Sequence, residues 1–123
     1  MVLVFIVGHV AAGSPILAEQ NVEDHILLSS ELAKDGFFLL RVRGDSMVNA
    51  GILNDDLVLV RPQHEAPNGS IVVALVDGDA TVKRIERANG HVKLIAENPA
   101  YEPIVTSNVS LVGQVRGVIR LFR

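Results

Sequence analysis

Short apolar runs separated by turn residues constrain the fold of this chain more than any other feature. Runs rich in Val, Ile and Leu recur through its second and third thirds, and Gly or Asn interrupts them. Such runs predict β-strands, because branched side chains pack well on a pleated surface. The strands predicted in this way are 38–43, 57–61, 70–76, 80–85, 91–95 and 112–121.

Two pairs of turn residues predict tight hairpins between neighbouring strands. Asp77-Gly78 and Asn89-Gly90 each lie between two apolar runs, and these residue types tolerate the positive φ angles that two-residue hairpin turns require. Helical periodicity is scarce. The segments that could form short helical turns are 29–34 and 47–50. We therefore predict a mostly β fold, with curled antiparallel sheets of short strands and one or two short helical turns.

Size and composition indicate a single globular domain. The chain has 123 residues, of which 49% are hydrophobic and 20% charged, a balance typical of one soluble domain with its own core. A net charge of −3 argues against strong DNA binding by this chain alone. The absence of cysteine excludes disulfides, thiolate catalysis and cysteine-ligated metal, and it suits a reducing cytoplasm.

The apolar stretch 1–7 admits a targeting interpretation and a structural one. It is far shorter than the roughly 20 residues that span a bilayer, and it lacks the basic region of a signal peptide. Ala11-Ala12 could still mimic a small-residue cleavage site. We interpret 1–7 as a buried strand or the end of a linker, and we expect no membrane association.

The segment Gly44-Asp45-Ser46-Met47 is the first candidate for catalysis. It follows directly after the predicted strand 38–43. A serine after a glycine at a strand end can lie on a tight turn with its hydroxyl accessible, where neighbouring backbone N–H groups can stabilise an oxyanion. A serine after Gly-Asp is also a common turn residue, so the motif alone leaves both interpretations open.

The segment Thr81-Val82-Lys83 is the second candidate. Side chains alternate along a strand, so Thr81 and Lys83 share one face. A lysine normally titrates near about pH 10.4, but burial beside Ile85 could lower its pKa by roughly 3–5 units. Such a lysine would be a neutral base for a serine, and the Thr81 hydroxyl could orient it. A solvated lysine is the alternative.

Taken in order, these motifs resemble the LexA and UmuD peptidase family. The likeness extends over about residues 7–120. The further segments that carry it are Val10-Ala11-Ala12-Gly13-Ser14-Pro15, Gly51-Ile52, Asn54-Asp55-Asp56-Leu57, Asn68-Gly69, Glu97-Asn98-Pro99-Ala100-Tyr101, Pro103-Ile104 and Val115-Arg116-Gly117-Val118-Ile119-Arg120.

The resemblance implies a serine endopeptidase that cuts its own chain. Ser46 would attack the carbonyl of Ala12 and cleave the Ala12–Gly13 bond, and Lys83 would be the base. The backbone N–H groups of Asp45 and Ser46 are the candidates for the oxyanion hole. The residues expected to support these groups are Thr81, Asp79 and Met47.

The resemblance also implies a domain organisation and partners. Residues 8–123 would form a peptidase and dimerisation domain, with the cleavage region at about 8–28 and the family's N-terminal DNA-binding domain absent. The whole protein would be a cytoplasmic repressor of the SOS response to DNA damage, inactivated by self-cleavage when a RecA filament on single-stranded DNA binds it. We expect a homodimer through the closing strand, 111–121, no cofactor, and no metal, since the four histidines lack ligand spacing.

Three alternatives remain open at this stage. A UmuD-type mutagenesis protein would carry the same Gly-Asp-Ser-Met motif, although its cleavage site more typically reads Cys-Gly, so Ala12-Gly13 favours the repressor. A dimerisation module without catalysis would use the same closing strand. Signal peptidase shares the serine–lysine chemistry but needs a membrane anchor, which this sequence does not display.

Overall fold

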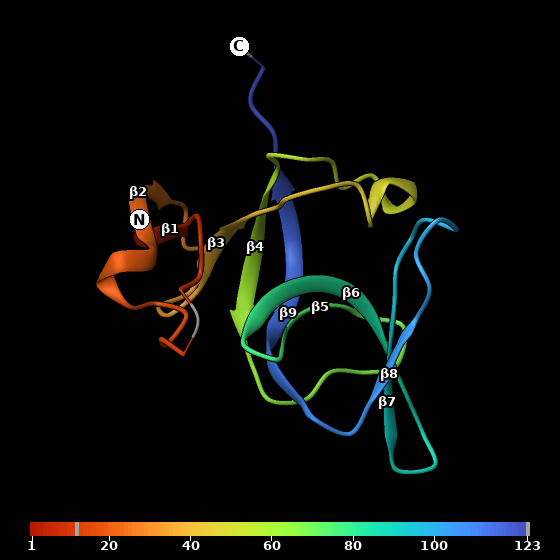
Figure 1. The fold of residues 1–123 in the computed structure, drawn as a ribbon. Helices are drawn as coiled ribbons and strands as arrows, with labels where there is room; N and C mark the ends of the chain where they lie inside the picture. Colours follow the sequence, from red (N-terminus) through yellow and green to blue (C-terminus); the bar gives the residue numbers. More distant parts are fainter. Residues whose placement is uncertain (12, 123) are drawn as a thin grey trace.

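Nine β-strands make up almost all of the regular structure (Figure 1). The structure is a computed structural model that describes residues 1–11 and 13–122. Two short 3₁₀ helices, η1 (Glu19–Asn21) and η2 (Val48–Ala50), accompany the strands. The strands are β1 (Val2–Val7), β2 (Val22–Leu28), β3 (Phe38–Arg41), β4 (Leu57–Pro62), β5 (Ile71–Val76), β6 (Asp79–Ala88), β7 (His91–Ile95), β8 (Ile104–Thr106) and β9 (Val109–Ile119). The prediction of a mostly β fold is confirmed.

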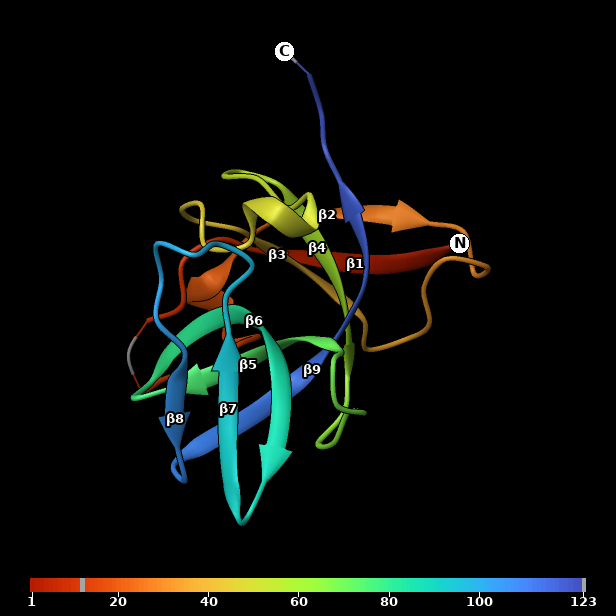
Figure 2. The ribbon, with the colours of Figure 1, turned by 90° about the vertical axis from the view of Figure 1, so that its right-hand side faces the viewer.

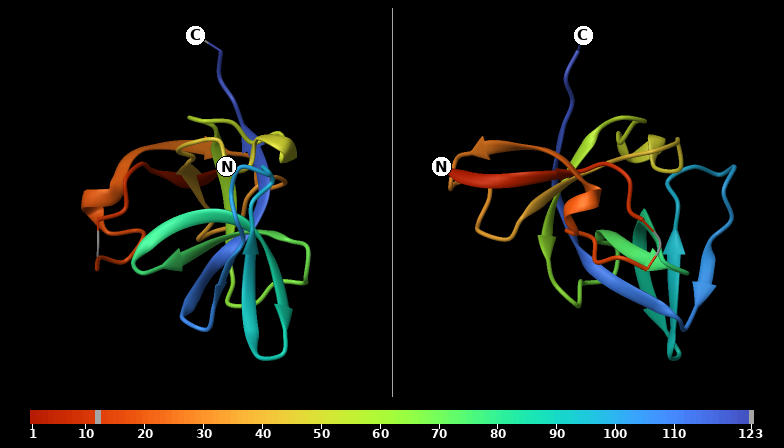
Figure 3. Two further views of the ribbon diagram at one scale, coloured as in Figure 1. Left: turned by 45° about the vertical axis from the view of Figure 1, so that its right-hand side comes forward. Right: turned by 60° about the vertical axis from the view of Figure 1, so that its left-hand side comes forward.

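The strands form one curled sheet in the order β2-β1-β3-β4-β9-β5-β6-β7-β8. The later strands curve away from the first ones, so that the long, bent β6 arches over the middle of the molecule (Figures 2 and 3). Neighbouring strands are antiparallel except β1 and β3, which run parallel. This exception follows from the chain path, because β2 takes one edge of β1 and β3 returns along the other.

The predicted hairpins are present. Asp77 and Gly78 have φ angles of 51° and 83° between β5 and β6, and Asn89 and Gly90 have 54° and 77° between β6 and β7. Positive φ at both central residues is the geometry of a type I′ hairpin turn. Segment 47–50 contains η2 as predicted. Segment 29–34 forms one hydrogen-bonded turn in which Ala33 N–H donates to Ser29 O (3.1 Å).

Two strands, β2 and β8, were not predicted. β2 carries three consecutive polar residues, Glu23, Asp24 and His25, all exposed, which hide its alternation. It is an edge strand paired only with β1, and an edge strand needs less apolar surface.

No helix in the described part of the chain is long and apolar enough to cross a membrane.

The largest buried cluster lies under the two catalytic candidates. It joins side chains from β1, β3, β4, β5 and β6 with Met47, which precedes η2. Both Met47 and Val82 belong to it, each a direct neighbour of one candidate. Val10 and Ile16, from the segment after β1, pack against the same cluster. One core therefore supports the serine turn, the lysine strand and the segment of the predicted cleavage site.

Gly113 allows β9 to approach β4 closely. A Cβ atom at this position would overlap the carbonyl oxygen of Arg61 and lie 2.7 Å from Val60 Cγ1, whereas a Cβ at Gly117, on the same strand, would meet nothing within 4 Å. We predict that Gly113→Ala lowers the free energy of unfolding by about 1–3 kcal/mol, because the backbone of β4 cannot move aside cheaply. Urea denaturation measures this, with Gly117→Ala as the matched control. Equal effects of the two substitutions would contradict it.

Candidate active site

Ser46 lies on a turn that the neighbouring residues hold firmly. Gly44 adopts a φ of 86°, a conformation that glycine reaches without steric cost, and its N–H donates to Asn54 Oδ1 (2.8 Å). On the other side of the serine, Met47 is only 1% exposed and anchors the turn in the core. The Ser46 side chain is half-buried between these anchors, so its hydroxyl is both held and accessible.

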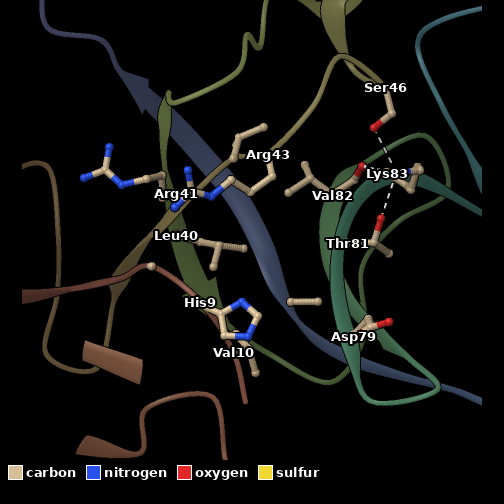
Figure 4. A pocket seen from close by; sticks show the side chains of 13 residues that line it. His9, Val10, Leu40, Arg41, Arg43, Ser46, Asp79, Thr81, Val82 and Lys83 are labelled. Atoms are coloured by element: carbon tan, nitrogen blue, oxygen red, sulfur yellow. Dashed lines mark hydrogen bonds between the residues drawn. The ribbon is translucent and has the colours of Figure 1, made fainter. Parts of the chain in front are cut away.

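Lys83 reaches the serine from β6. Its Nζ lies 3.0 Å from Ser46 Oγ, 2.7 Å from Thr81 Oγ1 and 3.1 Å from the Val82 carbonyl oxygen. Thr81 and Lys83 share one face of β6, as the alternation of a strand requires, and both point toward Ser46 (Figure 4). The arrangement gives the amine three oxygen neighbours at hydrogen-bond distance.

Burial shifts the protonation equilibrium of the Lys83 amine toward its uncharged form. The residue is 9% exposed, and this burial lowers the pKa of the Lys83 amine, because removal from water penalises its charged form. Within the described residues no carboxylate forms an ion pair with it. A serine hydroxyl beside a neutral amine is the arrangement needed for proton transfer to a general base.

A cleft of about 230 Å³ opens beside the pair. Its lining comes from three places: the segment Gly8–Val10 after β1, the end of β3 with Arg43 and Ser46, and the first half of β6. Figure 4 shows His9 and Val10 at the end of the cleft away from Ser46. Asp79, exposed at the start of β6, also lines that end and lies away from the Lys83 amine.

Of the predicted cleavage site the structure describes Gly13, which is not among the residues that line the cleft beside the catalytic candidates. Ala12 lies outside the described residues. Gly13 is exposed and has a φ of 77°, in a turn closed by the Ser14 N–H donating to Ala11 O (3.1 Å). The structure thus brings together Ser46, Lys83 and Thr81, and Gly13 is not part of this group.

Two residues that sequence reasoning did not recruit support the serine turn. Asn98 Nδ2 donates to the Asp45 carbonyl oxygen (3.0 Å), and the Tyr101 hydroxyl donates to Asp45 Oδ1 (2.7 Å). The Asp45 carboxylate raises the pKa of Tyr101 through this bond. The residues belong to a segment that carried the family likeness, but no spacing in the sequence indicated that it would reach Asp45, more than fifty positions earlier.

The Asn98 bond also sets the direction of the Ser46 N–H. Carbonyl and N–H point in opposite directions across a trans peptide, so holding the Asp45 carbonyl toward Asn98 turns the Ser46 N–H away from it. Neither the Asp45 nor the Ser46 N–H donates a hydrogen bond within residues 1–11 and 13–122. Both groups are therefore free to bind a developing negative charge.

Asp56 ties the loop after Ser46 to the end of β9. It is 2% exposed and accepts two bonds of 2.7 Å from the Arg120 guanidinium, which also donates to the Gly51 carbonyl (2.8 Å). The bonds to Arg120 hold the pKa of Asp56 below its usual range. Bidentate pairing of this kind compensates the burial of a carboxylate, and it braces the loop on which the serine turn rests.

We predict that Lys83→Met raises the stability of the fold near neutral pH. Because burial depresses the pKa of Lys83 below that of an unfolded chain, the unfolded state binds more protons between the two pKa values, and wild-type stability rises with pH across that window. The gain from methionine should therefore be largest at neutral pH and shrink toward about pH 10.5, the ordinary lysine value. Denaturant unfolding of both chains in a Ser46→Ala background measures it. A pH-independent difference would contradict the burial argument.

Comparison with known proteins completes the description of this site. The model of a family described as Peptidase S24-like matches residues 5–116. The chain is 50% identical over 116 residues to the LexA repressor of Caldicellulosiruptor saccharolyticus, an alignment that covers 94% of this chain and 57% of that protein. It is 52% identical to the LexA repressor of Mycolicibacterium paratuberculosis, covering 94% of this chain and 50% of that protein. The chain spans about half the length of the curated relatives it matches.

Proposed function

Because this chain belongs to the Peptidase S24-like family, we propose that it is the self-cleaving peptidase domain of a LexA-type repressor. The resemblance to LexA-type peptidase domains is confirmed by matches at about 50% identity. Self-cleavage, its site and its activator are proposals. The observation that carries them is the contact between Ser46 Oγ and a buried Lys83 amine at 3.0 Å.

The reaction begins with proton transfer inside this contact. Neutral Lys83 takes the proton of the Ser46 hydroxyl as Oγ attacks the carbonyl carbon of Ala12. The protonated lysine then gives a proton to the leaving amine of Gly13, and water hydrolyses the ester between Ser46 and Ala12. Thr81 holds the amine in place through its 2.7 Å contact with Nζ.

The oxyanion of the tetrahedral intermediate would be stabilised by the N–H groups of Asp45 and Ser46. Preorganised donors of this kind are worth on the order of 10²–10³ in rate. Asn98 and Tyr101 hold Asp45 at its carbonyl and its carboxylate, which keeps the donors in place before the substrate segment arrives.

We infer that this structure, in which Gly13 does not line the cleft with Ser46, corresponds to a resting form. Cleavage requires the segment after β1 to move along the cleft that Gly8–Val10 already line. An activator accelerates this step only by binding the cleavable form more tightly than the resting form. The RecA filament on single-stranded DNA is the activator proposed here, and loss of repressor function in the SOS response is the proposed result.

The proposed homodimer has a structural basis in β9. This strand pairs with β5 through residues 109–114 and with β4 through residues 113–119. From 115 to 119 the side facing away from β4 therefore has no strand partner within the described residues. Val118, Leu121 and Phe122 are exposed there or just beyond, and a second copy could pair along this edge.

We predict that the purified chain cuts itself at alkaline pH and that Ser46→Ala abolishes the cut without unfolding the protein. Mass spectrometry after incubation at about pH 10, where the lowered pKa of Lys83 leaves more of the amine deprotonated than in an ordinary lysine, should give two fragments that separate Ala12 from Gly13. Circular dichroism should report the same β-rich fold for both chains. An intact mass for the wild type would favour the dimerisation module without catalysis, and fragments from Ser46→Ala would remove Ser46 from the mechanism.

We predict that the rate of self-cleavage rises with pH between about pH 7 and pH 10. The lowered pKa of Lys83 places its titration below the ordinary lysine value, and the reactive form of the pair is the deprotonated one. The initial rate of fragment appearance across this range measures the effect. A flat profile in a chain that does cleave would show that Lys83 is not the titrating base.

A further inference from the structure

Asn21 is the most thoroughly hydrogen-bonded side chain outside the catalytic cleft. It lies at the end of η1 and is 2% exposed. Its Oδ1 accepts from the Ala11 N–H (2.9 Å). Its Nδ2 lies within donor distance of three oxygens: Ser14 Oγ (3.1 Å), Pro15 O (2.9 Å) and Ile16 O (3.2 Å). Both ends of the carboxamide are therefore used, and all of its partners belong to one short segment.

Those partners stand on both sides of the turn that contains the proposed scissile bond. The turn is closed by the Ser14 N–H donating to Ala11 O (3.1 Å), and the Ser14 hydroxyl donates to the same oxygen (2.7 Å). Asn21 holds Ala11 on the entering side and Ser14 on the leaving side. One buried side chain thus fixes the shape of the turn from both ends.

The side-chain bonds of Asn21 all lie within the segment 11–16, whereas its backbone joins that segment to the end of the β1–β2 pair. Its backbone oxygen accepts from the Gly8 N–H (3.1 Å), so residues 8 and 21 are joined and the segment between them is internally braced. The contacts of this segment with the main core are the apolar side chains of Val10 and Ile16. A movement of this segment about its attachment at Gly8 and Asn21 would change the apolar contacts of Val10 and Ile16, but it would not require the side-chain bonds of Asn21 to break.

We propose that Asn21 is a positioning residue that presents the scissile bond as a preformed turn. The inference rests on the proposed self-cleavage. A turn that is already ordered loses little further conformational freedom when it enters the cleft, and preorganisation of this kind lowers the barrier of an intramolecular reaction. Asparagine suits the task because it offers an acceptor and two donors on one planar group. Aspartate would lack the donors and bury a charge.

The first test compares self-cleavage of Asn21→Ala with that of Asn108→Ala, an exposed asparagine whose side chain makes no hydrogen bond within the described residues. Asn21→Ala should slow cleavage by at least about tenfold, since the loss of one or two buried hydrogen bonds changes an equilibrium by about that factor. The midpoint of the pH–rate profile should stay unchanged, because Lys83 is untouched. An unchanged or faster rate would overturn the proposal, the faster rate showing that Asn21 holds the turn away from Ser46.

The second test separates presentation of the turn from general damage to the fold. Two substrates are compared first: Ser46→Ala and the double variant Ser46→Ala/Asn21→Ala, each incubated with a chain that retains Ser46. Asn21→Ala with Ser46 intact is then used as the enzyme, with the Ser46→Ala chain as its substrate. Asn21→Ala should be a poor substrate and an undiminished enzyme. Equal losses in both roles would assign Asn21 to folding and overturn the proposal. If the wild type itself does not cleave, the proposed function fails first.

A third measurement does not depend on cleavage. The measurement is hydrogen exchange in the Ser46→Ala background. Asn21→Ala should remove the protection of the Ala11 amide, because the hydrogen bond from the Ala11 N–H to Asn21 Oδ1 is lost. The amides of the central strands β4 and β9 should stay protected. Unaltered protection at Ala11, or its loss throughout the sheet, would contradict a role confined to the turn.

Discussion

The contact between the Lys83 amine and the Ser46 hydroxyl is the interaction on which the proposed function of this structure depends. A lysine is a useful base only without its proton, and water normally keeps the proton in place. Here β6 carries the side chain inward, so that the amine has protein oxygens around it and little solvent. Burial of the Lys83 amine destabilises the fold, and the same burial lowers the pKa of the amine, which the proposed base chemistry requires.

The turn that carries Ser46 and the strand that carries Lys83 pack on the same hydrophobic core, and this packing offsets the cost of burying the amine. Met47 and Val82 occupy the same apolar cluster, so the serine turn and the lysine strand cannot move independently without disturbing it. Polar contacts from outside the core complete the support. Asn98 and Tyr101 hold Asp45, and the Asp56–Arg120 pair holds the loop that follows. The proposed catalytic pair, Ser46 and Lys83, is therefore held in position by contacts that involve no substrate segment.

In the proposed mechanism, control must act on the substrate segment, because Ser46 and Lys83 are already in contact. The segment after β1 is tethered to the same domain, so its effective concentration is high, yet Gly13 is not among the residues that line the cleft beside Ser46. In this proposal, self-cleavage is controlled by the position of the internally hydrogen-bonded segment 8–21 relative to Ser46. Val10 and Ile16 hold that segment on the core by apolar contacts, which can slide, whereas Asn21 maintains its internal shape by hydrogen bonds, which are directional.

The sequence by itself determined what depends on neighbouring residues. Asp77-Gly78 and Asn89-Gly90 specify hairpins because their backbones tolerate positive φ, and alternation along β6 was enough to place Thr81 and Lys83 on one face. The family motifs further indicated which serine and which lysine to pair. These are local properties, and they hold whatever the chain does elsewhere.

Only the tertiary structure decided what depends on residues far apart. The parallel pairing of β1 with β3, the reach of Tyr101 to Asp45 and the pairing of Asp56 with Arg120 join positions that no periodicity connects. Asp56 follows another aspartate in a loop, a pattern that suggests a solvated carboxylate, and Asn21 is one of several asparagines in the sequence. Their roles arise from burial against particular partners, and burial is a property of the folded chain as a whole.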